Sequence, residues 1–487
     1  MIERVKKSSL SREIELLQGL ARRRKAELHL VGGFLRDLHL GREGKDMDFA
    51  VAKGAISLAR AFAVLIHGTF ILLDKEAGCA RVAKKKNGVL WTYDFADFRA
   101  PTIAGDIKGR DFTINTLSCD LFRLTGSADL KEVCRPNVKA RQDLKAKCIR
   151  AVSARAFEDD PLRLLRAYSL AAQTGFRIEP LTLKFIRARV KLIRDVSPER
   201  VREEIFKVLE SPRAARMLRQ MHRDGLLFTA LPQLQSMEGV VQGGYHHLDV
   251  WKHSLLVLEK LETVLGYFKD DAAVTAALEE VVAGGHTRRS LLRFACLLHD
   301  AGKPATRLKG PDGRTTFHGH EHEGRRIARI MARKLKMASR ERFLLEDLVT
   351  LHLRPGYLSN FKKPSEKAVY RFLRDAKGEA LAVVLLAMAD QRATLGPLTT
   401  AYDAEHHDAV CRAVLQQLLA AQQAPVQAPF INGHDLIKEL KLNPGPLFKK
   451  ILAAVEEEKH LGKVTTREAA LAFAAKVIAT QAAMGVH

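Results

Sequence analysis

The chain has 487 residues, too many for one hydrophobic core, and this length corresponds to about three or four domains. Its 80 basic residues against 56 acidic ones give a formal charge of +24, which favours nucleic acid over a membrane as partner. No apolar run has the length of a signal-peptide core or a membrane span, and the six cysteines indicate neither a zinc knuckle nor a disulfide scaffold. We therefore expect a soluble cytoplasmic protein with no membrane partner.

Strand-like segments are confined to the first 150 residues. They are rich in apolar and β-branched residues and are bounded by glycine or polar residues. These segments are 26–31, 47–52, 69–73, 79–85, 89–98 and 116–122.

From about Asp159 onward, apolar residues recur at three and four spacing, which predicts helices and no convincing strand. Breaks lie near 242–247 and in the linker-like segment 420–429. We predict an α+β fold, with a small mixed sheet in the head followed by helical parts only. The predicted divisions are a head (1–150), a neck (151–240), a helical domain (241–420) and a tail (421–487).

Two aspartates lie one residue apart in the segment KDMDF. If Met47 lies on a strand, Asp46 and Asp48 point to the same face, because side chains alternate along a strand. Two carboxylates on one face suit a divalent metal, and Asp94, at the end of a later strand, is a candidate third ligand. An isolated pair of this kind is most often two solvated acids of a loop or strand.

A glycine pair precedes the aspartates. Gly32 and Gly33 follow the apolar run LHLV and precede a short helical segment that Gly41 can end. A tight turn at a helix N-terminus presents free N–H groups to a phosphate. The two features together favour a site for a nucleoside triphosphate and a metal.

These residues belong to a longer series of motifs. VGGFLRDLHLG with KDMDF, then GRDFTINTLSCDL, then DDPLRLLRA resemble, in order and spacing, the class II tRNA nucleotidyltransferase (CCA-adding) and bacterial poly(A) polymerase superfamily over roughly residues 28–210. The tail segment FINGHDLIKELKLNPGPLFKKIL is also similar to these enzymes. The resemblance implies an RNA 3′-end nucleotidyltransferase that adds C, A or both to tRNA from CTP and ATP and releases pyrophosphate.

The resemblance also implies roles for individual residues. Asp46 and Asp48 match the Mg²⁺ ligands, and Asp94 matches the third carboxylate less closely. Among the nucleotide-binding positions, Arg110 matches the residue that neutralises the triphosphate. The full set implied for the nucleotide is Gly32, Gly33, Arg36, Arg110, Asp160, Arg163 and Arg166.

The last three residues of this set match the segment that selects the incoming base. Asp160, Arg163 and Arg166 are three apart and are expected to share a helix face. A carboxylate accepts from the exocyclic amine that C and A carry, and a guanidinium donates to the adjacent ring nitrogen, whereas U and G leave these groups unpaired. An ordinary surface ion pair is the competing interpretation.

The chain departs from the family pattern at three places. Asp159 stands where many members carry Glu, and Ser169 where many carry a further Arg. Only six residues separate Arg99 from Asp106, where full CCA-adding enzymes often carry a longer flexible segment. This short segment indicates a partial enzyme, either CC-adding or specific for another single nucleotide.

Histidine and aspartate form a second pattern between about 240 and 400. His253, His299 with Asp300, and Asp390 follow the order of ligands in the HD phosphohydrolase domain, which the segment LLHDAGK resembles closely. Imidazole and carboxylate together suit a divalent transition metal of unknown identity. The resemblance implies hydrolysis of phosphoesters, and His320 and His352 are candidate ligands of a second metal.

Basic residues are concentrated in two runs. Residues 325–342 carry eight basic residues against one glutamate, and residues 131–150 carry seven against two acids. Taken singly, each run is equally compatible with a solvated helix face, but two runs in one chain favour binding of an RNA backbone.

Several functions remain compatible with these patterns. A poly(A) polymerase acting on general RNA shares every head motif with a tRNA nucleotidyltransferase. An HD-type phosphohydrolase with an RNA-binding head is an alternative of another class. A non-enzymatic RNA chaperone fits poorly with two separate sets of metal ligands.

Overall fold

The computed structural model describes residues 10–483 except 43, 124–133, 136–137, 312 and 424–427. The chain forms two compact units, residues 1–230 and 231–487, which are described separately below. Parts of the expected linker 420–429 and of the basic run 131–150 lie outside the described residues. No helix in the described part of the chain is long and apolar enough to cross a membrane.

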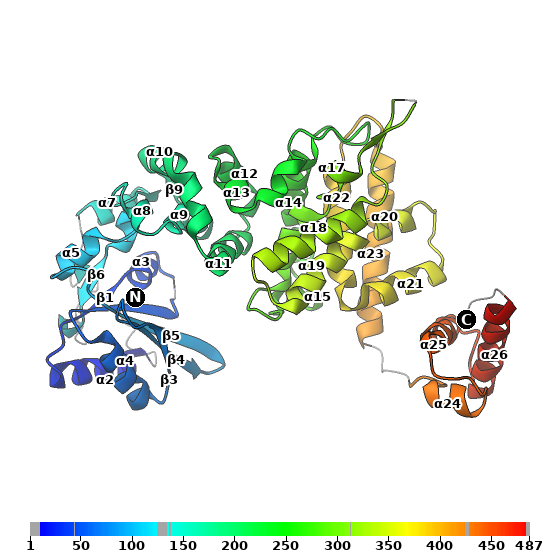
Figure 1. The fold of residues 1–487 in the computed structure, drawn as a ribbon, viewed down its shortest axis with the longest axis horizontal. Coiled ribbons are helices and arrows are strands. Elements are labelled where there is room, and N and C mark those ends of the chain that lie inside the picture. Colours follow the sequence, from blue (N-terminus) through cyan, green and yellow to red (C-terminus); the bar gives the residue numbers. More distant parts are fainter. Residues whose placement is uncertain are drawn as a thin grey trace. The chain divides into compact units, whose positions relative to one another are not determined.

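A mixed sheet of seven strands forms the head of the first unit (Figure 1). Its strand order is β3-β4-β5-β2-β1-β6-β7, with β2 and β5 parallel and the other described pairs antiparallel. All six predicted strand segments are present, which confirms the α+β class. The strands are β1 (Leu28–Val31), β2 (Asp46–Val51), β3 (Thr69–Asp74), β4 (Cys79–Lys86), β5 (Val89–Asp97), β6 (Ser118–Asp120) and β7 (Cys134–Arg135).

Helix α4 (Ala55–Ile66) covers one face of the sheet at β4 and β5, and α2 (Leu10–Arg23) packs against α4. The core between them is aromatic, with Phe62 edge-on to Tyr93 at 5.3 Å between ring centroids. Met47 is buried in this core. Since side chains alternate along a strand, Asp46 and Asp48 lie on the other face of β2, as predicted.

The first unit contains further short helices, two between strands of the sheet along the chain and the rest after its last strand. They are α3 (Gly33–His39), α5 (Ile103–Lys108), α7 (Val138–Lys145), α8 (Ala156–Asp159), α9 (Arg163–Thr174), α10 (Pro180–Arg189), α11 (Pro198–Leu209), α12 (Ala214–Arg223) and α13 (Leu226–Ala230). Helices α9 and α11 pack against each other.

The expectation of no strand after Asp159 is wrong in detail. Two-residue strands pair at 148–149 with 177–178 and at 308–309 with 315–316. Two residues are too few to produce a recognisable alternation of apolar and polar positions, so the sequence pattern does not register them.

The second unit is helical. Its helices are α14 (Val250–Tyr267), α15 (Ala272–Glu279), α16 (Arg288–Leu298), α17 (Lys303–Thr306), α18 (His320–Lys334), α19 (Ser339–Leu351), α20 (Arg354–Ser359), α21 (Glu366–Ala376), α22 (Ala380–Ala393), α23 (Ala401–Gln423), α24 (Gly433–Lys438), α25 (Pro446–His460) and α26 (Arg467–Ala483).

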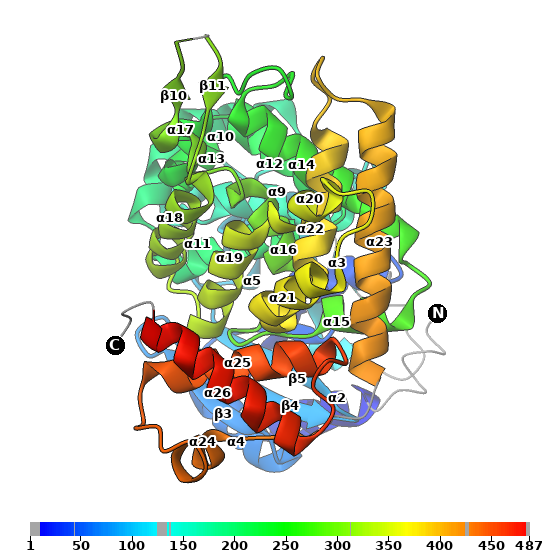
Figure 2. The same ribbon diagram turned by 90° about the vertical axis from the view of Figure 1, so that its right-hand side faces the viewer.

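Helix α22 is the centre of this unit. It contacts α14, α16, α19 and α23 (Figures 1 and 2). It contains the longest apolar run of the chain, and its residues are buried from Ala380 to Ala389. A helix that is apolar on every side is stable only when other elements surround it. The tail helices α24 to α26 have a separate small core around Ile451 and Val455.

Candidate active site and metal centre

The three carboxylates predicted as head ligands lie on adjacent strands. In the parallel pair β2 and β5, Asp48 is directly opposite Asp94. The Arg81 guanidinium donates to both oxygens of Asp94 at 2.7 Å, and the Thr92 hydroxyl donates to Asp46. Burial and the neighbouring Asp94 carboxylate raise the pKa of Asp48 to about 6. Such crowding of like charges fits a site that receives a divalent cation.

The glycine turn comes very close to this group. Gly32 has a φ of 81°, in the left-handed region, and a Cβ there would lie 2.9 Å from Asp48 Oδ2 and 3.3 Å from an Arg110 nitrogen. Only glycine fits this turn without displacing both side chains. Gly33 begins α3, and Gly41, with a φ of 71°, follows the end of that helix as predicted.

Arg110 is held close to the carboxylates by a residue that the sequence interpretation missed. Asp106, on α5, accepts a hydrogen bond from Arg110 at 3.2 Å and is itself buried. The Nε of Arg110 is buried and has no hydrogen-bond partner among the residues that the structure describes. This buried N–H donor beside the glycine turn suits an anionic ligand such as a phosphate.

A buried chain of polar residues links Arg36 to Arg166, two of the other predicted arginines. Arg36 donates to Asn115 at 2.8 Å and also pairs with Asp37, so its guanidinium is tied to protein groups. Asn115 donates to Asp111 at 3.1 Å, and Asp111 lies 3.1 Å from the Nε of Arg166.

Asp111 and Asn115 were therefore missed as positioning residues. The Arg166 charge, the Phe112 N–H and Asn115 together outweigh the effect of burial and lower the pKa of Asp111. A signal was present, because Asp111 and Asn115 are polar residues four apart that lie next to the apolar residues Phe112 and Ile114 in GRDFTIN.

The predicted common helix face of the base-selecting residues is wrong for Asp160. Helix α8 ends at Asp159 and α9 begins at Arg163, and Asp160 between them is extended, with φ −149° and ψ 97°. The cause is Pro161, since a residue before proline avoids the helical conformation.

Asp160 and Arg163 have different partners in this arrangement. The Asp160 carboxylate accepts from Arg200 on α11 at 2.9 Å and from the Leu162 N–H at 3.2 Å. Arg163 is buried and donates to the Ala156 carbonyl at 3.1 Å. Arg200 is a further candidate that the sequence interpretation did not include.

The short segment after Arg99 is fixed at both ends. The Thr102 side chain caps α5 by accepting from the Gly105 N–H. Asp106 accepts from the Arg99 N–H at 3.2 Å as well as from Arg110. One buried carboxylate thus ties the start and the end of this segment together.

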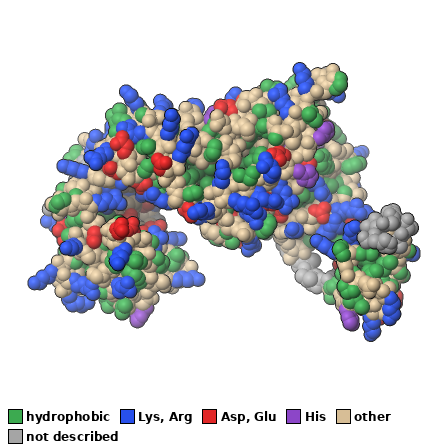
Figure 3. Space-filling model, viewed as in Figure 1, with side chains coloured by type: hydrophobic (Ala, Val, Ile, Leu, Met, Phe, Trp, Pro, Cys, Tyr) green, Lys and Arg blue, Asp and Glu red, His purple; other side chains and the backbone are tan. Residues whose placement is uncertain are grey.

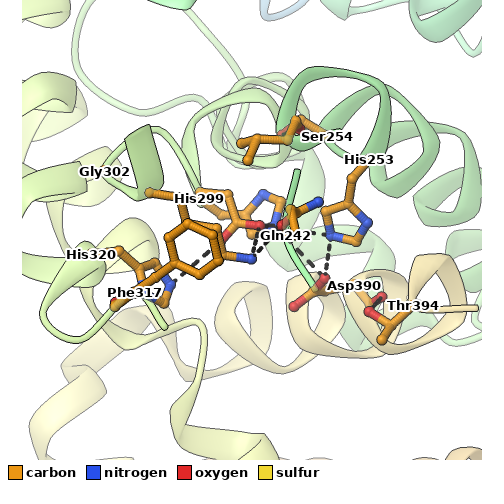
Figure 4. Close-up of polar contacts among 12 residues, drawn as sticks. Gln242, His253, Ser254, His299, Gly302, Phe317, His320, Asp390 and Thr394 are labelled. Atoms are coloured by element: carbon orange, nitrogen blue, oxygen red, sulfur yellow. Dashed lines mark hydrogen bonds and ion pairs between the residues drawn. The ribbon is translucent and has the colours of Figure 1, made fainter. Parts of the chain in front are cut away.

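The four predicted HD ligands lie together in the second unit (Figure 4). His253 is on α14, His299 and Asp300 directly follow α16, and Asp390 is on α22. His253 Nε2 lies 2.9 Å from Asp390 Oδ1, and His299 Nε2 lies 3.7 Å from the same oxygen. Asp300 Oδ2 is 3.2 Å from His299 Nε2. The separations and the residue types fit a transition-metal site.

His320 and His352 complete a second group around Asp300. His320 is the first residue of α18 and His352 directly follows α19. Their Nε2 atoms lie 3.4 Å and 3.8 Å from Asp300 Oδ1. Burial lowers the pKa of His352 to about 3, so this ring is neutral at pH 7.

A cleft of about 770 Å³ opens onto these residues. Lys303 lies in it, with its ammonium 2.7 Å from Asp300 Oδ2 and 2.6 Å from the Gln242 side chain. The exposed rings of Tyr245 and Tyr357 also line the cleft. Cationic and aromatic groups at its walls suit a phosphoester with a ring system.

The basic run 325–342 is largely paired within the protein. Glu346 is fully buried and accepts from Arg325, Arg329 and Arg342 at 2.8–3.1 Å. Arg326 pairs with Glu323. In Figure 3, Lys and Arg side chains are spread over the face shown, with acidic side chains among them. Much of this run therefore holds α18 and α19 together, a role that its composition did not indicate.

Four family profiles match successive parts of the chain. They are described as "Poly A polymerase head domain" (28–150), "Probable RNA and SrmB- binding site of polymerase A" (175–238), "HD domain" (246–394) and "tRNA nucleotidyltransferase domain 2 putative" (398–475).

Solved structures share the fold. A "tRNA-processing enzyme (apo form I)" is 20% identical with a TM-score of 0.60, covering 91% of this chain and 98% of that one. A CCA-adding enzyme in complex with ATP is 18% identical with a TM-score of 0.60, covering 96% and 93%.

Similar proteins are also known, and two of them match over more than nine tenths of both chains. An A-adding tRNA nucleotidyltransferase of Deinococcus radiodurans is 33% identical over 91% of this chain and 94% of its own length. A CC-adding tRNA nucleotidyltransferase of Thermus thermophilus is 30% identical over 91% and 92%. A CC-adding enzyme of Geobacter sulfurreducens is 37% identical over 60% and 63%. With these relatives and the head geometry, the resemblance found in the sequence is confirmed, and the chain belongs to the tRNA nucleotidyltransferase family.

Proposed function

We propose that the protein extends the 3′ end of tRNA with a single kind of nucleotide, taken from CTP or ATP. The observation that carries the proposal is the group of Asp46, Asp48 and Asp94 on adjacent strands, beside Gly32 and Arg110. The names of the full-length relatives support tRNA as the acceptor. A tRNA substrate would place the reaction in the cytoplasm.

In the proposed mechanism, Asp46 and Asp48 would hold Mg²⁺, which would supply charge neutralisation at the reacting phosphate. The terminal hydroxyl oxygen of the RNA attacks the α-phosphorus, and the bond to pyrophosphate breaks. Arg110, oriented by Asp106, binds the triphosphate, and Gly32 leaves room for it. Asp111 keeps Arg166 in position near the nucleotide.

Base selection falls to Asp160 and Arg163. The Asp160 carboxylate would accept a hydrogen bond from the exocyclic amine that C and A share, and the Arg163 guanidinium would donate to the adjacent ring nitrogen. U and G would leave these groups unpaired. We propose a partial enzyme because Asp106 binds both ends of the segment 99–110 and so fixes its conformation. A fixed segment favours a nucleotide-binding pocket that accepts a base of one size. An enzyme that adds first C and then A must change the shape of its nucleotide-binding pocket between the two additions.

Incorporation assays with defined acceptors test this proposal. The purified chain is incubated with tRNA ending before the two C residues, tRNA ending in CC, and an unrelated RNA, with each nucleotide supplied singly. We expect extension on one of the two tRNA acceptors and with one nucleotide. Addition of both C and A contradicts the partial enzyme, and long A tails on the unrelated RNA indicate a poly(A) polymerase instead.

A second function is favoured by the HD ligands. His253, His299, Asp300 and Asp390 would hold a divalent metal that supplies Lewis-acid activation of water and phosphate. Lys303 is placed to bind the phosphate of a phosphoester, whose P–O bond breaks as water adds and the alcohol leaves.

Release of p-nitrophenol from bis(p-nitrophenyl) phosphate, measured with Mn²⁺, tests the hydrolase. The variant Asp46→Ala with Asp48→Ala separates the two activities, since it is expected to lose incorporation and keep hydrolysis. If incorporation persists in that variant, Asp46 and Asp48 do not hold the catalytic metal and the proposed mechanism fails.

A further inference from the structure

Six aromatic side chains are at least half exposed in the described part of the chain. They are Tyr245, Tyr267, Phe343, Tyr357, Phe361 and Tyr402. Two of these rings are covered by cations. Arg392 and Arg412 lie over the Tyr267 ring, and Arg342 lies over the Phe343 ring. No ammonium or guanidinium group of the described residues lies over the other four rings, which are therefore available to a ligand.

The four uncovered rings come from segments that meet at one cleft, the cleft of about 770 Å³ described above. Tyr245 and Tyr357 line it, together with the exposed side chain of Leu398. Helices α20 and α23, which carry Tyr357 and Tyr402, pack against each other (Figure 2). The Gly396 N–H donates to the Tyr245 carbonyl at 2.8 Å and so fixes the segment before α23 to the first ring.

His406 connects the remaining two rings to the cleft. Its side chain lines the cleft, and its Nε2 lies 3.0 Å from the Phe361 carbonyl oxygen. The Tyr402 ring stacks on the His406 ring, with 6.0 Å between the centroids and 5° between the planes. Phe361 and Tyr402 are 65% and 69% exposed. The cleft therefore continues outward as an aromatic surface, the aromatic rim, which consists of Tyr245, Tyr357, Phe361 and Tyr402.

The charged groups at the aromatic rim favour an anionic ligand. Lys362 and Lys363 follow α20, are exposed, and pair with no acidic group among the residues that the structure describes. The acids of the cleft wall, by contrast, have partners within the protein; they are Glu321, Asp390 and Asp403. The two lysines are therefore available to the phosphate groups of a nucleic acid.

We propose that the aromatic rim, with Lys362 and Lys363, binds an unpaired RNA strand without regard to its sequence. Proteins that bind single strands stack successive bases on exposed rings, and every base has a face that can stack. A duplex does not fit, because its bases already stack on one another. The site goes beyond the proposed nucleotidyl transfer and hydrolysis, since it needs neither the head carboxylates nor a metal.

Fluorescence anisotropy with a labelled polyuridine strand of about 12 nucleotides tests the proposal. The full chain is measured in EDTA, so that neither metal site takes part. Phe361→Ala with Tyr402→Ala should raise Kd at least about tenfold, because each lost stacking contact weakens binding about fivefold or more. Lys362→Gln with Lys363→Gln should reduce the slope of log K against log salt by about 1.4, since each phosphate of a single strand contributes about 0.7.

Phe343→Ala is the matched control, because Phe343 is also half exposed but does not line the cleft. It should leave Kd unchanged, and so should Tyr402→Phe, which keeps the ring. A Kd that Phe361→Ala with Tyr402→Ala leaves unchanged overturns the proposal, as does an equal loss with Phe343→Ala. Equal weakening of binding to a duplex RNA of the same length also overturns it.

Photocrosslinking locates the bound strand within the chain. The same strand with 5-iodouridine in place of uridine is irradiated with the wild-type protein, and crosslinked peptides are identified by mass spectrometry. We expect crosslinks at Phe361 or Tyr402. Crosslinks confined to the first unit overturn the proposal.

A labelled proline-rich peptide tests the other ligand that exposed aromatic grooves bind. Peptide binding that Phe361→Ala abolishes, with polyuridine binding unchanged, identifies the aromatic rim as a peptide site and overturns the proposal. Nucleotide incorporation into tRNA separates this inference from the proposed transferase. Loss of polyuridine binding with incorporation retained supports a separate RNA site. Loss of both in Phe361→Ala with Tyr402→Ala overturns it, because the rim would then belong to the tRNA acceptor site.

Discussion

Replacing Glu346 by glutamine is expected to destabilise the second unit strongly. This carboxylate is fully buried between α18 and α19, and three arginines donate to it. A glutamine side chain at this position would keep the shape but direct an amide NH₂ group at a guanidinium. Breaking a buried ion pair costs about 3–5 kcal/mol, and the arginines are partly exposed and can regain water, so we expect about 3 kcal/mol for Glu346→Gln.

Thermal unfolding measures this cost. For a unit of this size, about 3 kcal/mol corresponds to a fall of roughly 6–12 °C in Tm. Glu323→Gln is the matched control, because Glu323 lies on α18 and pairs with the exposed Arg326 at the surface. Surface pairs contribute little, so the control should change Tm by less than about 3 °C. Equal falls in Tm for both variants would refute the argument that burial makes the Glu346 ion pairs more stabilising than the surface pair of Glu323.

The pH dependence gives a second check on the same residue. The hydrogen bonds of Arg329, Arg325 and Arg342 outweigh burial and lower the pKa of Glu346 to about 2 from its usual value of 4.5. The stabilisation is therefore present above pH 4.5 and is lost as pH falls towards 2. The Tm difference between the wild-type chain and Glu346→Gln should narrow over that range, and a constant difference would contradict the ion-pair explanation.

Three further outcomes are expected for the first unit. Asp48→Asn should lower nucleotide incorporation by more than about 100-fold in a rate assay, because a metal clamp stabilises the transition state by several kcal/mol, while Mn²⁺ binding in the second unit stays unchanged. CTP or ATP, but not GTP or UTP, should raise the Tm of the first unit, and Asp160→Asn should abolish this difference; equal shifts with all four nucleotides would exclude base selection there. Arg200→Ala should raise KM for the nucleotide about fivefold with little change in kcat, since it leaves the Asp160 carboxylate free to reorient. Partial rescue by Arg200→Lys distinguishes this positioning role from a general loss of structure.

Local pattern was sufficient for much of the fold. The alternation of apolar residues located all six predicted head strands, and the one-residue spacing of Asp46 and Asp48 placed them on one face of β2. Even so, the prediction that Asp160 and Arg163 share a helix face was wrong. The two residues are three apart, but they do not lie on one helix, because Pro161 separates the end of α8 from the start of α9 at Arg163.

The sequence by itself determined the strands, the aspartate pair, the order of the HD ligands and the family, because these depend on periodicity and on residues close together in the chain. Only the tertiary structure decided which distant groups meet. It showed that Asp111 and Asn115 connect Arg36 to Arg166. It also showed that Glu346 pairs with three arginines of a basic run that composition suggested for RNA. Such contacts depend on how helices and strands pack, and packing brings together side chains whose separation along the chain carries no periodic signal.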